Sequence, residues 1–204
     1  MNQSARDEGV IKYQAIHQTG DAPTHDLLDT LNQARTDLFD LGLVGVYPDG
    51  IGFGNVSIRH QQGCIISGTG TGSIRTLSSD SYCYVQNYNL EKNTVYTLGP
   101  VNASSESMTH CAIYHADASI QSVLHIHHRA LWHRLLQIGY PSTPADIAYG
   151  TPQMALSMAD LVRAKHYPSA IIVMAGHEDG IISYGQSIPL ALKQIYAAMT
   201  NSII

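Results

Sequence analysis

Two histidines one residue apart, His125 and His127, are the first candidates for chemistry in this chain of 204 residues. Alternate residues of a β-strand point to the same face, so a strand over Ser122–His127 would present both imidazoles together. Neutral imidazole is a ligand for zinc and for other late divalent ions. The alternative is a pair of hydrogen-bonded core or surface histidines, because His-x-His is a short pattern. His128 breaks the alternation and is a weaker ligand candidate.

A third ligand would complete such a site, and His177 is the best candidate. It follows Ala170–Met174, a continuous apolar run that predicts a strand delivering the next residues to the rim of a sheet. Taken alone, His177 is an ordinary loop histidine. Taken with His125 and His127, it predicts a metal site with three histidine ligands.

The triplet Ser104-Ser105-Glu106 stands at the predicted start of a helix. Free backbone N–H groups and the helix dipole favour an anion there, and two hydroxyls add donors suited to a phosphate. The alternative is a plain N-cap followed by a glutamate in the first turn. Glu106 is a candidate general acid or base if a neighbouring metal site removes it from water.

Two segments of small residues are further candidates for anion binding. Gly52-Phe53-Gly54-Asn55 predicts either a turn or a nest of backbone N–H groups with the amide of Asn55 aimed at an anion. Ser67-Gly68-Thr69-Gly70 predicts a loop that lacks the lysine of a P-loop, which argues against nucleotide binding.

The elements that must position these residues alternate between helices and strands. Leucines at helical spacing predict a helix from about Leu27 to Leu41, which Gly42 ends. Strands are predicted near 56–58, 64–66, 82–85, 94–98, 122–127, 170–174 and 180–184, and further helices near 104–115, 131–138, 152–165 and 187–199. This order predicts an α/β fold layered around one sheet. Residues 1–23 are polar and predict an N-terminal arm, which leaves residues 24–204 as a single domain.

The composition argues against several classes of protein. Charged residues make up only 13%, which excludes a charge-rich disordered chain and suggests surface used in subunit contacts. A net charge of −5 gives no sign of nucleic-acid binding. We expect no membrane span, because no apolar run approaches about 20 residues. We expect no secretory signal, because the N-terminal sequence MNQSARDEGV has no apolar core. Three scattered cysteines predict a reducing compartment, the cytoplasm.

The order of the motifs along the chain resembles that of the class II aldolase/adducin family. The resemblance runs from about Leu27 to Ala198 and rests on five motifs in the same order. These are Gly54–Arg59, Ser67-Gly68, Ser104-Ser105-Glu106 with His110, His125-x-His127, and His177. The 19-residue step from Glu106 to His125 is similar to that of the family's sugar-phosphate aldolases.

The resemblance implies a three-layer α/β/α sandwich with a central, largely antiparallel mixed sheet. It implies that three histidines bind Zn²⁺ or another divalent metal, and that Glu106 is the catalytic acid/base. The implied metal ligands are His125, His127 and His177, and the implied phosphate-binding residues are Asn55, Ser67, Gly68, Ser104 and Ser105. The implied assembly is a homotetramer with active sites between subunits, which agrees with the low charge content.

The implied reaction is retro-aldol cleavage of a phosphorylated ketose to dihydroxyacetone phosphate and an aldehyde. The metal would act as a Lewis acid, and Glu106 would move the proton at the carbon beside the carbonyl. Dehydration of a sugar phosphate, as in the methylthioribulose-phosphate dehydratases, also uses Glu and is the close alternative. The family's 4-epimerases carry Asp at the position of Glu106, which disfavours that reaction. A non-catalytic scaffold like the head domain of adducin is the alternative of a different class.

Two departures from the family pattern lie beside the histidines. Glu178 and Asp179 separate His177 from a glycine that directly follows the histidine in many members. These two extra residues are expected either to shift the ligand or to add a carboxylate near it. His128 stands where proline is common.

The third departure is at the end of the chain. The sequence stops at Ile204, without the tail whose tyrosine reaches a neighbouring active site in the well-known aldolases. Tyr149 and Tyr184 are the candidates to replace that tyrosine as proton donor to the aldehyde oxygen. The alternative is that both are structural.

Overall fold

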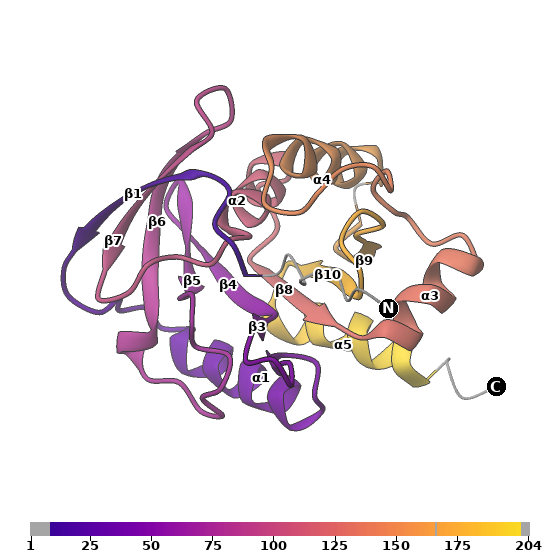
Figure 1. Ribbon diagram of the computed structural model, residues 1–204, viewed down its shortest axis with the longest axis horizontal. Helices are drawn as coiled ribbons and strands as arrows, with labels where there is room; N and C mark the ends of the chain where they lie inside the picture. The colour runs from indigo at the N-terminus through magenta and orange to yellow at the C-terminus, as the bar shows by residue number, and fades with distance from the viewer. Residues whose placement is uncertain (1–8, 166, 201–204) are drawn as a thin grey trace.

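An eight-stranded sheet crosses the molecule in the order β1-β7-β6-β5-β4-β8-β10-β9 (Figure 1). The computed structural model describes residues 9–165 and 167–200. Within them, β1 and β7 pair in parallel, and every other neighbouring pair in this sheet is antiparallel. The strands are β1 Gln14–Thr19, β4 Asn55–His60, β5 Gly63–Ser67, β6 Tyr82–Asn89, β7 Thr94–Gly99, β8 Ser122–His127, β9 Ser169–Val173 and β10 Gly180–Gly185.

Helices cover both faces of this sheet and complete three layers (Figure 1). One layer holds α2 (Ser107–Ala116) and α4 (Pro152–Lys165), which pack on each other. The opposite layer holds α1 (Leu28–Asp40), α3 (Arg129–Gln137) and α5 (Ile188–Thr200). A short 3₁₀ turn, η1, spans Ser79–Ser81. The expected α/β/α sandwich with a largely antiparallel mixed sheet is therefore confirmed.

Two apolar cores, one on each face of the sheet, hold the layers together. Side-chain alternation along a strand divides neighbours between them: Ile66 packs with α2 and α4, and Ile65 packs with α1 and α5. In β8 the same alternation sends Val123 toward α2 and Leu124 toward α1. His125 and His127, two and four residues after Val123, therefore belong to the α2 side of the sheet.

The helix predicted at Leu27–Leu41 is α1. Leu31, Ala34 and Leu38 are buried at the expected spacing. The helix ends where Gly42 adopts a left-handed φ of 69° and donates its N–H to Phe39 O at 2.9 Å. At the other end of the chain, Ser187 Oγ accepts the N–H of Leu190 and begins α5, as its position predicts.

The segment expected to form an N-terminal arm contains the edge strand β1. Gln14–Thr19 pairs with Thr94–Gly99 of β7, and Tyr13 just before it is buried. The strand is exposed on both faces apart from one partly buried residue, so it lacks the polar–apolar alternation that marks a strand in sequence. Residues 1–8 of the segment lie outside the described residues, and the division at residue 23 stays a prediction.

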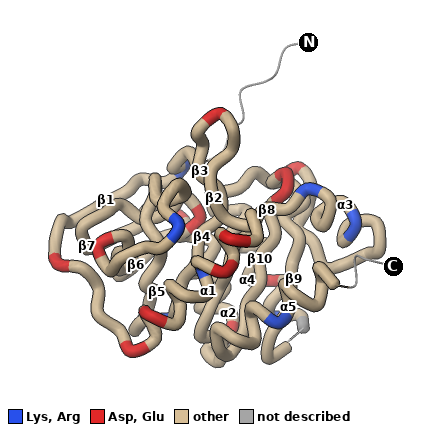
Figure 2. The backbone as a smooth tube through the Cα atoms, turned by 90° about the horizontal axis from the view of Figure 1, so that it is seen from below, with Lys and Arg blue, Asp and Glu red and all other residues tan. Residues whose placement is uncertain are grey.

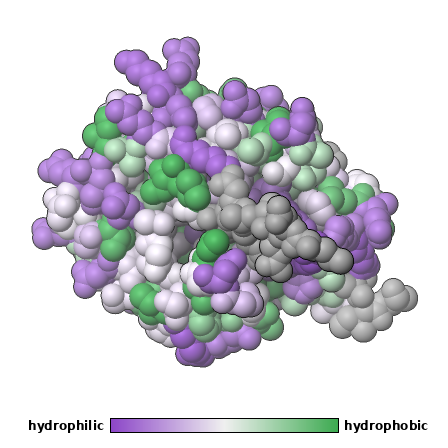
Figure 3. Space-filling model, in the orientation of Figure 1, coloured by the Kyte–Doolittle hydropathy of each residue, from purple (hydrophilic) through white to green (hydrophobic). Residues whose placement is uncertain are grey.

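The described part of the chain has no helix with the length and apolar character needed to cross a membrane. Charged residues are spread thinly over the chain (Figure 2). On the face seen in Figure 3, hydrophobic residues form separate patches between hydrophilic ones.

Candidate active site

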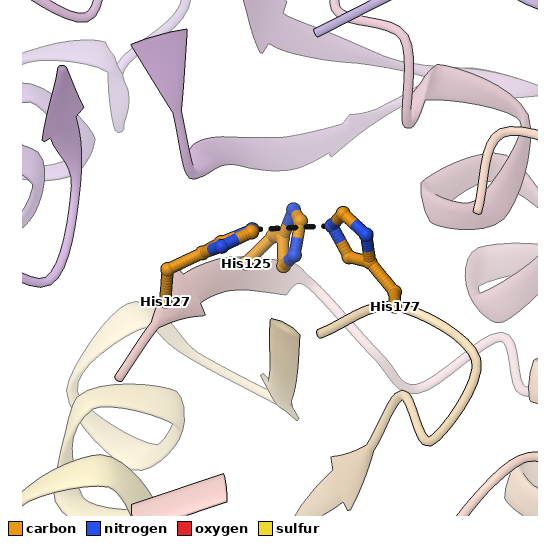
Figure 4. A group of neighbouring side chains, drawn as sticks. All are labelled: His125, His127 and His177. Atoms are coloured by element: carbon orange, nitrogen blue, oxygen red, sulfur yellow. Dashed lines mark hydrogen bonds between the residues drawn. The ribbon is translucent and has the colours of Figure 1, made fainter. Parts of the chain in front are cut away.

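Three histidine side chains meet at one end of β8 (Figure 4). His125 and His127 project from alternate positions of this strand. His177 comes from the turn between β9 and β10, and the pairing of Gly180 with His127 brings that turn beside β8. All three are almost fully buried. The sheet thus assembles the set that the sequence predicted.

The spacing of the imidazole nitrogens fits a metal ion. Nε2 of His127 lies 3.1 Å from Nε2 of His177. Two nitrogens bound to one zinc at about 2.0–2.1 Å in tetrahedral geometry are about 3.3 Å apart. The ligand atoms of the three residues all lie within 4.8 Å of one another. Nε2 of His125 is buried and has no hydrogen-bond partner among the described residues, so with the ring proton on Nδ1 a cation would satisfy the lone pair of Nε2.

Burial keeps two of these imidazoles, those of His125 and His177, in the neutral form that binds metal. It lowers the pKa of His125 to about 3. It also lowers the pKa of His177 well below its usual value, and any charge on His125 and the ammonium of Lys12 act in the same direction. Both rings are therefore neutral at pH 7, and a metal ion need not displace a proton from a charged imidazolium.

The two extra residues after His177 form a tight turn. The N–H of Gly180 donates to His177 O at 2.9 Å, and Asp179 adopts a left-handed φ of 70°. The carboxylate of Glu178 points outward and pairs with Arg129 at 2.7 Å, where both side chains are exposed. The turn therefore brings His177 to the other histidines, and Glu178 adds no carboxylate to the group.

Gly180→Ala is expected to weaken metal binding without unfolding the protein. A Cβ at Gly180 would collide with the ring of His177, so the ring must move from its present position. We expect zinc affinity to fall at least about 10-fold, as for other changes that misorient a ligand. Competition with a chromogenic chelator measures the effect, and unchanged affinity would show that the His177 ring does not depend on this contact.

Glu106 is buried at the start of α2. Neither carboxylate oxygen makes a hydrogen bond of normal geometry with a described residue, although the Thr109 hydroxyl and the Gly150 N–H are near enough to influence it. Burial raises the pKa of Glu106 to about 7, against the opposing effects of the Thr109 hydroxyl, the Lys12 ammonium and the backbone N–H of Gly150. A carboxyl group poised near neutral pH suits a general acid or base. Its oxygens do not belong to the three-histidine group.

A cavity of about 200 Å³ is lined by most of the predicted phosphate-binding residues. Four of the five line it: Asn55, Gly68, Ser104 and Ser105. The other lining residues are Gly9, Ile51, Gly52, Phe53, Gly54, Thr69, Gly70, Thr71 and Gly72. The Asn55 side chain also reaches the metal group, where Nδ2 lies 3.3 Å from Nδ1 of His125. Asn55 therefore joins the cavity to the histidines.

Gly54 makes this junction possible. It has a φ of 74°, and a Cβ there would lie 3.0 Å from the backbone oxygen of His125. Only glycine accommodates both the left-handed backbone and this close approach. The chain can therefore enter β4 directly against the histidine strand and place Asn55 opposite His125.

Two details of the predicted phosphate site differ in the structure. Ser67 does not line the cavity, and its Oγ accepts the N–H of Val56 at 3.1 Å, so its part in phosphate binding stays a prediction. The helix α2 begins at Ser107, with Glu106 at the N-cap position and without a side-chain cap. Ser104 Oγ instead accepts the N–H of Glu106 at 3.3 Å, before the helix begins.

The remaining candidates separate clearly. The ring centroids of Tyr149 and His177 are 4.5 Å apart. Tyr184, in contrast, packs in the core between the sheet and α4 and lines a different cavity. His128 begins α3, and its Nδ1 accepts the N–H of Leu131 at 3.0 Å. His128 thus has the structural role of an N-cap.

Two residues at the site were not predicted from the sequence. Lys12 lies with its Nζ 3.8 Å above the ring of Tyr149, and its charge lowers the pKa of both Glu106 and His177. The hydroxyl of Tyr47 lies 2.8 Å from Nδ1 of His127. Lys12 stands in a segment interpreted as an arm, and Tyr47 in a glycine-rich stretch with no motif, although Tyr47-Pro48-Asp49-Gly50 is a recognisable turn signal.

Comparisons with known proteins agree with this architecture. The family model for the class II aldolase and adducin N-terminal domain matches residues 38–201. L-fuculose-1-phosphate aldolase from Thermus thermophilus is similar, with a TM-score of 0.60 and 21% identity over 86% of this chain and 88% of that one. A sugar-phosphate aldolase from Thermotoga maritima gives a TM-score of 0.64 at 14% identity, over 85% and 90% of the two chains.

A third structure, YgbL from Klebsiella pneumoniae, described as a putative aldolase/epimerase/decarboxylase, gives a TM-score of 0.64 at 18% identity over 85% of each chain. A search of curated protein sequences finds no match. At these identities the structural likenesses show the fold. The family model covers most of the chain, and the chain therefore belongs to the class II aldolase and adducin N-terminal domain family.

Proposed function

We propose that this protein is a metal-dependent lyase that cleaves a phosphorylated ketose to dihydroxyacetone phosphate and an aldehyde. The observation that carries the proposal is the convergence of three buried, metal-competent histidines, joined through Asn55 to a cavity lined by Ser104 and Ser105. The structures that the chain resembles include a fuculose-phosphate aldolase and a sugar-phosphate aldolase by name. These names support a sugar phosphate as the substrate class.

The proposed roles follow from position and charge. His125, His127 and His177 would hold a divalent ion, with Zn²⁺ as the leading candidate, which would supply Lewis-acid stabilisation of negative charge. Asn55, Gly68 and the two serines would bind the phosphate and so anchor the substrate away from the reacting bond. Glu106 would give a proton to the carbon beside the carbonyl as the C–C bond breaks. Tyr149, next to His177, is the tyrosine that we propose for the proton at the aldehyde oxygen.

The buried polar atoms favour an enzyme over a scaffold. The oxygens of Glu106 and Nε2 of His125 are buried without hydrogen-bond partners among the described residues. Each such atom costs roughly 1–3 kcal/mol of stability, so a fold that only served as a scaffold would gain from apolar residues here. Buried unsatisfied groups are typical of sites that retain them for catalysis or metal binding.

Dehydration of a sugar phosphate is the second candidate reaction, because it would use the same metal site and the same glutamate. Incubating the zinc-loaded protein with a panel of ketose 1-phosphates separates the two. Formation of dihydroxyacetone phosphate, detected with a coupled NADH-dependent dehydrogenase, supports the aldolase. A product lighter by one water in a mass spectrum supports the dehydratase, and no reaction with any member of the panel contradicts the proposal.

Replacing both Ser104 and Ser105 by alanine is expected to weaken the binding of phosphorylated ligands more than that of non-phosphorylated ones. Each lost hydrogen bond to a charged group is worth about 1.5–3 kcal/mol, or roughly 10- to 100-fold in affinity. Calorimetric titration of a ketose phosphate and of its non-phosphorylated analogue measures the difference. Equal weakening of the two ligands would place the phosphate elsewhere.

The expected homotetramer with active sites between subunits stays part of the proposal. An apolar groove between α1 and the end of α5 supports self-association. It is lined by Leu41, Tyr196, Met199 and Thr200 together with Asp37 and Asp40, and Leu41 is 49% exposed. Light scattering of the purified protein gives the mass that tests the tetramer.

A further inference from the structure

We propose that Tyr47 is a positioning residue for the metal site: its hydroxyl fixes the tautomer and the orientation of His127. The inference rests on the proposed metal-dependent function and extends it to a residue outside the family motifs found in this sequence. It is carried by one contact, the 2.8 Å approach of the Tyr47 hydroxyl to Nδ1 of His127, and by the way the surrounding hairpin holds Tyr47 in place.

A short hairpin, β2 (Gly45–Val46) and β3 (Gly52–Phe53), presents Tyr47 to the site. The hairpin projects from the body of the molecule in Figure 2. Tyr47 is the first residue of its turn, where its N–H donates to Ile51 O and its carbonyl accepts the N–H of Gly50, both at 2.8 Å. Pro48 suits the second position of such a turn, and Gly50 supplies a left-handed φ of 84°. The backbone of Tyr47 is therefore fixed by local hydrogen bonds.

Aromatic packing fixes the side chain as well. The ring centroids of Tyr47 and Phe53 are 4.4 Å apart, and the centroids of Phe53 and the His127 imidazole are 5.5 Å apart. The rings of Tyr47 and His127 are arranged edge to face, with their centroids 6.1 Å apart. Rings at these distances attract one another, and the three together restrict where the Tyr47 hydroxyl can lie.

The contact between the Tyr47 hydroxyl and Nδ1 of His127 matters because it can select the tautomer of the imidazole. Nε2 of His127 faces Nε2 of His177 and is the nitrogen available to a metal ion. A neutral imidazole that binds metal through Nε2 carries its proton on Nδ1, and that proton needs an acceptor. The phenol oxygen of Tyr47 is such an acceptor. By stabilising this tautomer, Tyr47 keeps the proton off Nε2 and aims the ring at the ion.

The two histidines of β8 thus have different partners. Nδ1 of His125 faces the Asn55 amide from β4, a residue of the recognised family motif. Nδ1 of His127 faces Tyr47 from the hairpin, at a shorter distance. Loss of the Tyr47 hydroxyl should therefore affect one ligand and leave the other two in place.

The test compares Tyr47→Phe with the wild-type protein. Phenylalanine keeps the ring packing and removes only the hydroxyl, and we expect zinc affinity to fall about 10- to 100-fold. Tyr84→Phe is the matched control, because the Tyr84 hydroxyl accepts the N–H of Thr24 at 2.9 Å and the residue has no part in the proposed site. Competition with a chromogenic chelator gives the three affinities.

A second readout separates positioning from a loss of structure. The visible absorption spectrum of the Co²⁺-loaded protein reports ligand geometry and should change for Tyr47→Phe but not for Tyr84→Phe. The thermal midpoints of the metal-free variants should stay close to that of the wild type. Equal zinc affinity and equal spectra of wild type and Tyr47→Phe would overturn the inference while leaving the metal site intact. A wild-type protein that binds neither ion would overturn the proposed function and this inference together.

Discussion

Replacement of His125 by alanine is expected to abolish the retention of a divalent ion. Two histidines would remain, and among the described residues no carboxylate or thiol belongs to the group to replace the third nitrogen. Loss of a direct ligand should exceed the 10- to 100-fold effect of losing an outer hydrogen bond, so we expect at least about a 100-fold drop in zinc affinity. Elemental analysis after gel filtration gives the metal content per chain.

His128→Ala is the matched control for this experiment. His128 is one residue beyond the pair on β8, but its ring caps α3 through the N–H of Leu131. We expect this variant to keep its metal and to lose about 1 kcal/mol of stability, the usual cost of an N-cap. If His125→Ala kept its metal, or if His128→Ala lost it equally, the assignment of ligands along β8 would be wrong.

Glu106→Gln should retain the metal and lose turnover. Glutamine keeps the size of the side chain but can no longer exchange a proton, and general acid–base catalysis contributes about 100- to 10,000-fold in rate. Glu106 lies outside the three-histidine group, so the metal content should stay that of the wild type. Rates of product formation with a cleaved substrate measure the loss. A variant that still turned over near the wild-type rate would exclude Glu106 as the acid/base.

The buried carboxyl of Glu106 should also make the stability of the wild-type protein depend on pH. Because the folded protein raises the pKa of Glu106 from 4.5 to about 7, folding binds this proton between those pH values. The contribution of Glu106 to the free energy of unfolding therefore falls as the pH rises from about 4.5 to about 7, and the total change is on the order of 3 kcal/mol. Above pH 7 the buried, charged carboxylate therefore lowers the free energy of unfolding.

Metal-free Glu106→Gln should consequently be more stable than the metal-free wild type at pH 8, and the difference should shrink toward pH 5. Urea unfolding of both proteins at the two pH values measures it. The buried histidines act in the opposite direction, since a lowered pKa makes stability rise with pH up to about 6.5, but they are common to both proteins and cancel in the comparison. A difference independent of pH would mean that Glu106 is charged throughout.

Elements with strong periodicity were predictable from the sequence. The leucine spacing of α1 and the apolar runs of β5 and β9 each bury one face or both, so the pattern in the sequence reflects the core directly. His125 and His127 were predictable for the same reason. Two-residue periodicity on a strand dictates that they share a face, whatever the rest of the fold does.

The parts that were missed depend on contacts between distant segments. The edge strand β1 is polar and mostly exposed, and pairing with β7 through backbone hydrogen bonds leaves no mark in its side-chain pattern. Lys12, just before it, reaches Tyr149 more than a hundred residues away. The hydrogen bond that Ser67 Oγ accepts from the N–H of Val56 likewise joins two strands and could not be read from the sequence.

The metal content of the purified wild-type protein tests the central claim most directly. Elemental analysis for zinc and the other first-row metals should find about one divalent ion per chain, and exhaustive treatment with a chelator should remove it. Return of one ion per chain on adding zinc would support a site built by His125, His127 and His177. A protein that bound no such ion, even with zinc in excess, would contradict the account and favour a family member without catalysis.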